Sequence, residues 1–445
     1  MNEVALTDHG FPAEWCLREG EEVADLITKG ESPTWQGFSY QTDGVLFVTS
    51  ENVRDGFLDV STPKYISHRF DEKLYRSRLR EGDVLINLVG ASIGRSCVVP
   101  TGIGSANINQ AVCLFRPSSL VCTNYISSYL QLPQVISRLL GEQVETARAN
   151  VSLRDIRRFP FVTPILPEQK KIARILATLD NLIEKTEALI AKYQAIKQGM
   201  MHDLFTRGVD SSGQLRPTFQ DAPDQYRESE LGWIPKDCSV QKLKHVAERV
   251  VVGLALSVTH AYREKGVPLI RNQNIRSGYF EDDDMLYLDP QFAALFPNKA
   301  ARKDDVLTVR TGANVGDTAI VPDKYVNCPT FTTLITSTDK TVLNPMYLVH
   351  YIVSKFGMFE LNRLLVGGGK ENLNVGEFVK LRVVVPPIAS QEHFVAALAT
   401  IESQLESERR ALCKHKEMKS GLMQDLLTGK VRVKVDEAEE VAANA

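Results

Sequence analysis

One stretch of the sequence occurs twice, and this repeat constrains the fold more than any other feature. Residues 164–209 align without a gap on residues 386–431 at a shift of 222, and fourteen of the 46 positions are identical. A period of 222 residues is far longer than the roughly 20–50 residues of solenoid modules. The repeating unit is therefore a large architectural element, and the chain is a tandem duplication.

The first copy of the stretch is predicted to form one long helix. After Pro167 the chain has no proline before Pro217, and its only glycine before Gly208 is Gly199. About 40 residues at about 1.5 Å per residue predict a rod on the order of 60 Å. Apolar residues at spacings of three and four fall on one face of such a helix. They are Ile172, Ile175, Leu179, Leu182, Leu189, Tyr193, Ile196 and Met200, flanked by Leu176, Ile183 and Ile190.

The second copy keeps an apolar stripe but interrupts it with Gln404, Glu408 and His415. Two surface helices of separate domains would explain both stripes. Complementary stripes of equal length favour packing of the two helices against each other, with the polar interruptions setting the register. The seam residues expected to serve as spacer or partner-binding surface are Leu176, Leu179, Ile183, Ile190, Leu398, Ile401, Leu405 and Leu412.

Composition and cysteine usage exclude several classes of protein. The chain has 445 residues, 43% of them hydrophobic and 24% charged, which is ordinary for a folded protein of two or more domains. The first ten residues lack a secretory signal, and no run reaches the roughly 18–20 apolar residues of a membrane helix. The seven cysteines are scattered and never spaced C-x-x-C, so we expect reduced thiols in a cytoplasm. With a net charge of −3, nucleic-acid binding would depend on local patches.

The duplication extends into the regions before each helix. Asp83-Val84-Leu85 with Gly90 matches Asp305-Val306-Leu307 with Gly312 at the same shift. Strands are expected at 45–49, 83–89, 97–99 and 111–115, and a helix at 124–140. The basic stretch 61–80 has no basic counterpart near the acidic run 281–284. Two domains thus share a scaffold and differ in their loops, where recognition usually resides.

No catalytic or metal-binding constellation is evident. The run Gly367-Gly-Gly-Lys370 lacks the glycine and the Ser or Thr of a phosphate loop, because Leu364 and Glu371 stand there. The histidines and cysteines have no metal-ligand spacing. We therefore expect no catalytic residue and no metal in this chain.

Basic, aromatic and amide side chains on the variable loops are the candidates for DNA contact, since phosphate positioning and base reading require them. A solvated charged face is the alternative for the basic clusters, and capping of helices or strands is the alternative for the asparagines beside the long helices. In the first domain the candidates are Lys64, Tyr65, Arg69, Tyr75, Arg76, Arg78, Arg148 and Asn150. In the second they are Arg271, Arg276, Lys299, Arg302, Lys370, Asn372 and Asn374.

Three local motifs give the chain a resemblance to a known family. The first helix is entered through Thr163-Pro-Ile-Leu-Pro-Glu-Gln169 and left through Met201-His-Asp-Leu-Phe-Thr206, and both recur in modified form in the second half. The second domain opens with Glu228-Ser-Glu-Leu-Gly-Trp-Ile-Pro235. The chain resembles the specificity (S) subunits of type I restriction-modification systems over nearly its whole length. Ser390 stands where the first copy has Glu168, and is expected to weaken a cap there without changing the fold.

The resemblance implies a non-enzymatic chain that selects the DNA sequence. Each recognition domain would read one half of a bipartite, asymmetric site in double-stranded DNA. The paired helices would act as a spacer and dock two adenine-methyltransferase (M) subunits, and two restriction (R) subunits would complete the complex. S-adenosylmethionine, ATP and Mg²⁺ would be bound by those partners and not by this chain. We expect no membrane association.

The expected fold is α+β: a duplicated mixed α/β target recognition domain plus a long helix, with the helices in an antiparallel coiled coil of pseudo-two-fold symmetry. A parallel pair would need the connection after the first helix to span about 80 Å. The expected divisions are recognition domain 1 at 1–160, helix 1 at 161–209, a linker at 210–230, recognition domain 2 at 231–383, helix 2 at 384–431 and an acidic tail at 432–445.

Two other functions remain open at this level. A fused methyltransferase or nuclease should carry an Asn/Asp-Pro-Pro-aromatic motif or an acidic metal cluster, and the sequence has neither. A coiled-coil scaffold or repressor-like DNA-binding protein would have similar helices. Association with a methylating subunit distinguishes that last alternative.

Overall fold

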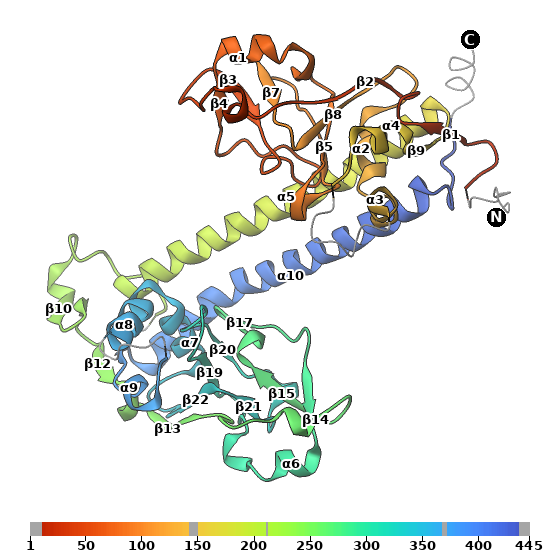
Figure 1. The fold of residues 1–445 in the computed structure, drawn as a ribbon. Helices are drawn as coiled ribbons and strands as arrows, with labels where there is room; N and C mark the ends of the chain where they lie inside the picture. Colours follow the sequence, from red (N-terminus) through yellow and green to blue (C-terminus); the bar gives the residue numbers. More distant parts are fainter. Residues whose placement is uncertain (1–10, 142–149, 211, 367–371, 436–445) are drawn as a thin grey trace. The chain divides into compact units, whose positions relative to one another are not determined.

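A computed structural model describes residues 11–141, 150–210, 212–366 and 372–435. The chain divides into two compact units, Met1–Glu187 with Arg410–Ala445, and Ala188–Arg409. Each unit combines one recognition domain with a stretch of both long helices (Figure 1). The predicted α+β class and the tandem arrangement are confirmed.

The two long helices are α5, Leu166–Thr206, and α10, Ile388–Leu427. Within the first unit, Lys419 pairs with Asp180 at 2.5 Å and Lys416 pairs with Glu187 at 2.8 Å. Residue numbers rise along one helix as they fall along the other, so the helices run antiparallel there. In the second unit Lys197 pairs with Glu402 at 2.6 Å and the Phe205 ring lies 4.7 Å from that of Phe394, so the numbers again rise along one helix and fall along the other. The predicted antiparallel pairing is confirmed within each unit.

The buried face of α5 differs from the predicted main stripe. Leu176 and Leu179 are buried, but Leu182 and Ile196 are 41% and 40% exposed. A straight helix drifts by about 20° per heptad relative to a strict seven-residue repeat. One continuous stripe therefore cannot face the partner along the whole helix, and the flanking row supplies part of the contact.

The first recognition domain contains two sheets and a short strand pair. Strand β1 (Cys16–Glu19) pairs antiparallel with β9 (Pro160–Thr163), immediately before α5. The four-stranded sheet has the order β2-β8-β5-β6: Ala24–Lys29, Val112–Pro117, Val84–Asn87 and Ser96–Val98. The three-stranded sheet has the order β4-β3-β7: Tyr65–Ile66, Val45–Val48 and Ala106–Ile108. The helices are α1 His68–Lys73, α2 Thr123–Leu130, α3 Pro133–Leu140 and α4 Leu153–Arg158.

The second recognition domain has a similar topology, with one additional strand in its second sheet. Strand β12 (Ser239–Lys242) pairs with β23 (Arg382–Val385) before α10. One sheet has the order β13-β22-β19-β20: Ala247–Val252, Thr333–Thr338, Val306–Val309 and Thr318–Ile320. The other has the order β14-β18-β15-β21: Tyr262–Arg263, Leu286–Leu288, Val267–Arg271 and Thr330–Phe331. The helices are α6 Pro290–Ala294, α7 Pro345–Val353, α8 Lys355–Val366 and α9 Val375–Phe378. The hairpin Ile275–Arg276 (β16) with Tyr279–Phe280 (β17) lies beside them.

Three local predictions need correction. The helix expected at 124–140 is two helices, α2 and α3, because the residue before Pro133 is disfavoured in the helical conformation. The stretch 61–80, expected to be a loop, contains β4 and α1. Part of the expected linker at 210–230 is strand β10 (Tyr226–Ser229), which pairs with β11 (Gly232–Pro235).

Equivalent side chains anchor both domains to their helices. The hydroxyl of Tyr125 donates to the Val162 carbonyl at 2.9 Å, and Tyr347 donates to the Val384 carbonyl at 2.9 Å. Gln169 accepts from the Cys122 amide at 2.8 Å, and Gln391 accepts from the Asn344 amide at 2.8 Å. Both glutamines also donate to the carbonyl five residues earlier at 2.8 Å. The two domains therefore share this set of Tyr and Gln hydrogen bonds, here called the seat, as well as a topology.

Among the described helices, none combines the length and apolarity that crossing a membrane requires. Six of the cysteines are free thiols: Cys16, Cys97, Cys113, Cys122, Cys238 and Cys328. Burial raises the pKa of Cys97, Cys113 and Cys238 to about 12, so these thiols are unreactive core groups.

Candidate nucleic-acid interface

The first recognition lobe is defined here as the β4-β3-β7 sheet, helix α1 and the adjoining 3-10 turns Thr34–Gln36 and Tyr75–Ser77. Ser67 caps α1 by accepting from the Phe70 amide at 3.3 Å. Phe70 and Leu74 are buried against the sheet. The opposite side of this segment exposes Arg69, Tyr75 and Arg76. The exposed side of α1 and of the turn after it therefore carries three cations, Arg69, Lys73 and Arg76, and one carboxylate, Glu72, on a packed support.

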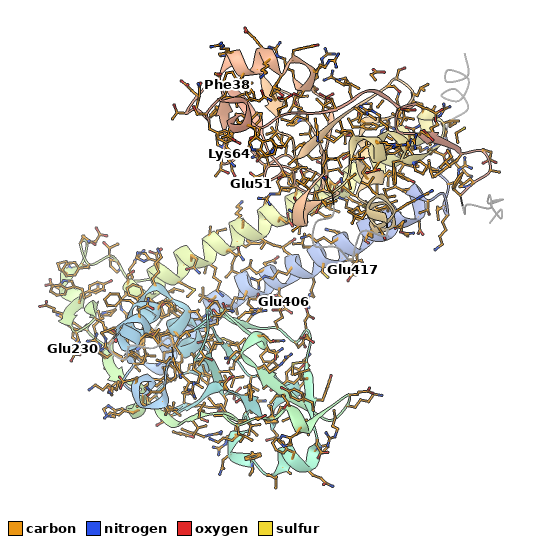
Figure 2. The ribbon with its side chains drawn as sticks, viewed as in Figure 1. Phe38, Glu51, Lys64, Glu230, Glu406 and Glu417 are labelled. Atoms are coloured by element: carbon orange, nitrogen blue, oxygen red, sulfur yellow. The ribbon has the colours of Figure 1, made fainter. Side chains whose placement is uncertain are left out.

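Two of the predicted basic contacts in this lobe have partners within the protein. Arg78 binds the buried Asp71 carboxylate at 2.7 Å, and the other oxygen of Asp71 accepts from Asn107 at 2.8 Å. Lys64 pairs with Glu51 at 2.7 Å (Figure 2), and this hydrogen bond lowers the pKa of the Glu51 carboxyl. Tyr65 is half-buried in β4. Arg69 and Arg76 form no ion pair with any described residue, so they are the cations most available to a phosphate.

The asparagine candidates have structural roles within the protein, as the alternative to DNA contact expected. Asn150 is exposed and forms an isolated bridge with Val89, next to Ser152, which caps α4 in a reciprocal capping box with Asp155. Asn374 caps α9 by accepting from the Glu377 amide at 3.0 Å. Asn372 accepts from the Arg310 guanidinium at 3.1 Å. Arg148 and Lys370 lie outside the described residues.

The second recognition lobe is the β14-β18-β15-β21 sheet with α6 and the hairpin β16–β17. Arg276 pairs with Glu281 at 2.6 Å, and Arg271 donates to Asp284. Lys299 donates to the Val252 carbonyl at 2.9 Å. The acidic run 281–284 therefore neutralises basic residues of its own lobe. Arg302 is exposed and forms no ion pair within the described ranges.

The predicted seam residues are unevenly buried. Leu398 is fully buried, and Leu176, Leu179 and Leu405 are nearly so. The other four, Ile183, Ile190, Ile401 and Leu412, are half-buried.

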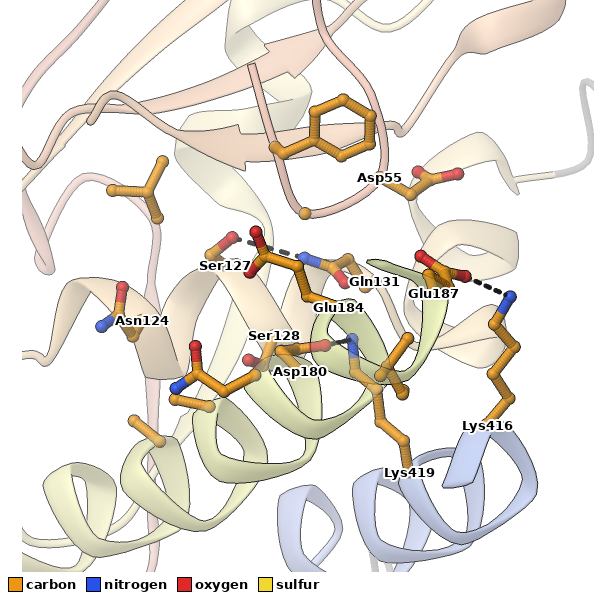
Figure 3. Close-up of a pocket in the computed structure, with 17 residues that line it drawn as sticks. Asp55, Asn124, Ser127, Ser128, Gln131, Asp180, Glu184, Glu187, Lys416 and Lys419 are labelled. Atoms are coloured by element: carbon orange, nitrogen blue, oxygen red, sulfur yellow. Dashed lines mark hydrogen bonds and ion pairs between the residues drawn. The ribbon is translucent and has the colours of Figure 1, made fainter. Parts of the chain in front are cut away.

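A polar hollow of about 770 Å³ lies between α2 and the helix pair in the first unit (Figure 3). Helix α2 contributes uncharged polar groups, including Asn124, Ser128 and Gln131. The Asp180–Lys419 and Glu187–Lys416 ion pairs lie on the opposite side. Among the described residues, no group of three or more His, Cys, Asp or Glu side chains could hold a metal ion.

The sequence reasoning missed the exposed aromatic groups of the first lobe. Trp35 is 80% exposed and Tyr40 45%. A tryptophan between Pro33 and Gly37 in an otherwise polar stretch is the signal that could have revealed this. The second lobe exposes Leu295 at 70% and has one exposed ring, Tyr279, at 40%. The two lobes thus differ in charge and in aromatic content.

Comparisons with known proteins agree with this architecture. The family model described as "Type I restriction modification DNA specificity domain" matches residues 14–194 and 236–414. The chain is 24% identical to the type I restriction enzyme MjaVIII specificity subunit of Methanocaldococcus jannaschii, over 96% of this chain and 95% of that protein. It is 23% identical to the putative MjaX specificity subunit of the same organism, over 95% of each chain.

Among solved structures, the fold is similar to that of the type I restriction-modification system S subunit from M. genitalium. The TM-score is 0.56 at 14% identity, over 96% of this chain and 97% of that one. The two family matches together cover most of the sequence, one in each half. The chain therefore belongs to the type I restriction-modification DNA specificity family, as a specificity chain with two DNA-recognition domains and not as a catalytic subunit.

Proposed function

We propose that each recognition domain reads one half of a bipartite, asymmetric DNA site. The observation that carries this proposal is the contrast between a shared scaffold and unlike lobes. The seat bonds of Tyr125 and Gln169 recur at Tyr347 and Gln391. By contrast, α1 carries charged residues of both signs and the basic turn Tyr75–Ser77 follows it, whereas the corresponding helix α6 has no charged residue. Equivalent scaffolds present equivalent surfaces to DNA, and different side chains there select different bases.

The long helices act in this proposal as a spacer and as the docking site for two adenine-methyltransferase subunits. The antiparallel ion pairs and the buried apolar residues within each unit support a stiff rod. S-adenosylmethionine belongs to those subunits, and ATP and Mg²⁺ belong to restriction subunits that join them. The target adenine is flipped into the partner's pocket, because enzymes that modify a base take it out of the stack.

Single-molecule mapping of methylated adenine tests the division into half-sites. Cells would carry this chain with its methylating partner, and either wild-type protein or a variant with Arg69, Tyr75 and Arg76 replaced by serine. These side chains are exposed, so the buried core of the lobe is kept. We expect discrimination to be lost or relaxed in one half only. Arg302→Ser is the matched variant for the other half. Changes in both halves from either variant would contradict the proposal.

A paired deletion tests the spacer role. Removing residues 185–191 and 407–413 takes one heptad from equivalent positions of both helices and keeps the seam in phase. Seven helical residues span about 10 Å, and one base pair spans about 3.4 Å. The gap should shorten by at most about three base pairs while both half-sites stay the same. An unchanged gap in a folded, active variant would refute the spacer role.

A further inference from the structure

Trp35 stands out on the surface of the first recognition lobe. Its residue surface is 80% exposed, more than that of any other large apolar residue in the described part of the chain. Water exposure of an indole leaves a large apolar surface unburied, and tryptophan is strongly favoured at sites where macromolecules bind. Because single exposed apolar side chains are common, the exposure of Trp35 is significant only together with the contacts of its turn and the charge of the neighbouring surface.

The turn that carries Trp35 is held firmly. The Gln36 and Phe38 amides both donate to the Pro33 carbonyl, at 3.0 and 2.9 Å. Gly37 ends the turn at a φ of 77°, in the left-handed region that favours glycine. Rigid support keeps the indole from collapsing onto the surface and lowers the entropy lost when it binds.

Two contacts fix this turn against α1. The Phe38 ring lies 4.7 Å from the ring of the buried Phe70 (Phe38 is labelled in Figure 2). The Lys73 amine donates to the Gln36 side-chain oxygen. The turn and helix α1 are therefore joined, and Trp35 directly precedes the residue that contacts Lys73 of α1.

The charge of this surface favours DNA as the partner. Arg78 neutralises Asp71 within the fold at 2.7 Å, which leaves the cations Arg69, Lys73 and Arg76 against one exposed carboxylate, Glu72, on this side. The Arg76 guanidinium lies 5.9 Å from the centre of the exposed Tyr75 ring. Cations that contact phosphates and aromatic rings that stack on bases are the combination by which proteins bind nucleic acid.

The second lobe does not repeat this arrangement. Its corresponding 3-10 turn, Thr259–Ala261, contains no tryptophan, and Ala261 is buried. Its helix α6 carries no charged residue. The feature therefore belongs to one half of the duplication.

We propose that Trp35 is a DNA-contacting residue of the first recognition domain. Its indole stacks on, or wedges between, bases at the edge of the first half-site, while Arg69, Lys73 and Arg76 hold the flanking phosphates. This inference rests on the proposed function. It adds an aromatic contact that only the first half-site receives.

The test measures DNA affinity of the complex of this chain with its methylating subunit. The probes are a fluorescein-labelled duplex carrying the site found by methylation mapping, and two duplexes in which the first or the second half is scrambled. Stacking of a base on an aromatic side chain is worth about 1–3 kcal/mol by alanine substitution. We expect Trp35→Ala to weaken binding of the intact site about 5- to 150-fold, and Trp35→Phe to retain most of the affinity.

The matched control is Trp233→Ala in the second unit. Trp233 is also half exposed, but its ring stacks on Phe219 at 4.4 Å. The control should bind the intact site as the wild type does. Trp35→Ala should also reduce discrimination against the duplex with a scrambled first half, and leave discrimination against the scrambled second half unchanged. An affinity within twofold of wild type for a folded Trp35→Ala complex would overturn the inference.

Failure of the proposed function gives a different result. Wild-type complex that does not discriminate either scrambled half refutes half-site reading, whatever Trp35 does. The fluorescence difference between wild type and Trp35→Phe identifies the partner. Quenching on addition of the duplex supports DNA contact. Quenching by the methylating subunit alone would assign Trp35 to a protein interface and overturn the inference.

Discussion

Ser128 in the first unit and His350 in the second occupy equivalent positions, three residues after the tyrosine that anchors each domain to its helix pair. Ser128 borders the polar hollow, whereas His350 is fully buried. Facing them are equivalent ion pairs, Asp180–Lys419 and Glu402–Lys197, and the second is the more buried. Both units therefore have equivalent seats, but the side chain that faces the ion pair is small and polar in the first unit and a buried ring in the second.

The neighbouring positions follow the same trend. The first unit has Asn124, Ser127 and Gln131 where the second has Met346, Val349 and Val353. Val349 is fully buried, and Met346 and Val353 pack against the core of the second unit. The comparison teaches that hydrogen bonds from the backbone and from Tyr and Gln maintain the seat. The space between them tolerates either polar or apolar side chains.

A second difference lies at the start of each long helix. Glu168 in the first unit is buried and binds Arg432 at 2.6 and 3.0 Å. It also accepts from the Trp15 indole at 3.2 Å. The second unit has the uncharged Ser390 there, while Gln391 keeps its bonds. The difference between Glu168 and Ser390 is therefore an ion pair that joins the segment after α10 to the first turn of α5. The weaker cap expected at Ser390 stays a prediction.

Removing the Glu168–Arg432 ion pair should give the largest change in the free energy of unfolding. Arg432→Ala leaves a buried carboxylate without its cation, which typically costs about 3–5 kcal/mol. We expect the lower figure, about 3 kcal/mol, because Arg432 is 31% exposed. Urea unfolding followed by hydrogen exchange of first-unit amides measures the loss. Lys430→Ala, which removes an exposed pair with Asp425, should cost less than about 1 kcal/mol. Equal losses from the two variants would contradict the role of Arg432.

Reciprocal exchange of Ser128 and His350 tests the contrast directly. His350→Ser removes a fully buried ring and should destabilise the second unit by about 2 kcal/mol, at the low end for large-to-small core changes, because neither ring nitrogen has a hydrogen-bond partner among the described atoms. Ser128→His enters the hollow and should change the stability of the first unit by less than about 1 kcal/mol. Hydrogen exchange at pH 7.5 resolves the two units. Similar losses of stability from the two exchanges would show that both units pack this position equally tightly.

Acid should destabilise the second unit selectively. Burial lowers the pKa of His350 from 6.5 to about 4, although Glu402 acts to raise it. Between these values the unfolded chain binds a proton that the folded unit excludes, so stability falls as pH drops below 6.5. By pH 5 the loss should be about 2 kcal/mol. Calorimetry of wild type and His350→Leu at pH 7.5 and 5 measures it, and an identical pH dependence in both would refute the assignment.

The smallest effect should be a gain. At pH 7.5, His350→Leu replaces a ring whose nitrogens form no hydrogen bond with the described atoms, although Nδ1 lies 3.7 Å from Glu402, by an apolar side chain of similar size. Buried polar atoms without partners cost about 1–3 kcal/mol. Part of that gain is lost because leucine has a different shape, so we expect stabilisation by about 1 kcal/mol in thermal unfolding. Destabilisation by His350→Leu would show that the imidazole has a polar partner in solution.

Much of the architecture follows from local sequence. The stretches that begin near Val45 and Val84 were predicted as strands, which the structure contains, and the apolar stripe of the first repeat predicted α5. The candidate interface was less accessible. Lys64 is bound by Glu51, 13 residues away in the sequence, whereas Arg69 has no ion-pair partner among the described residues. No rule of sequence spacing predicts this difference between the two cations. Trp35 was missed because exposure is a property of the folded surface.

The sequence by itself determined the duplication, the long helices and the scaffold of strands, since periodicity and repeat identity are readable along the chain. The tertiary structure alone decided which equivalent positions are buried and which basic residues are free. It also brought Glu168 to Arg432, 264 positions apart. The physical reason is that helix and strand patterns arise between near neighbours, whereas burial and ion pairing depend on side chains that converge from distant segments.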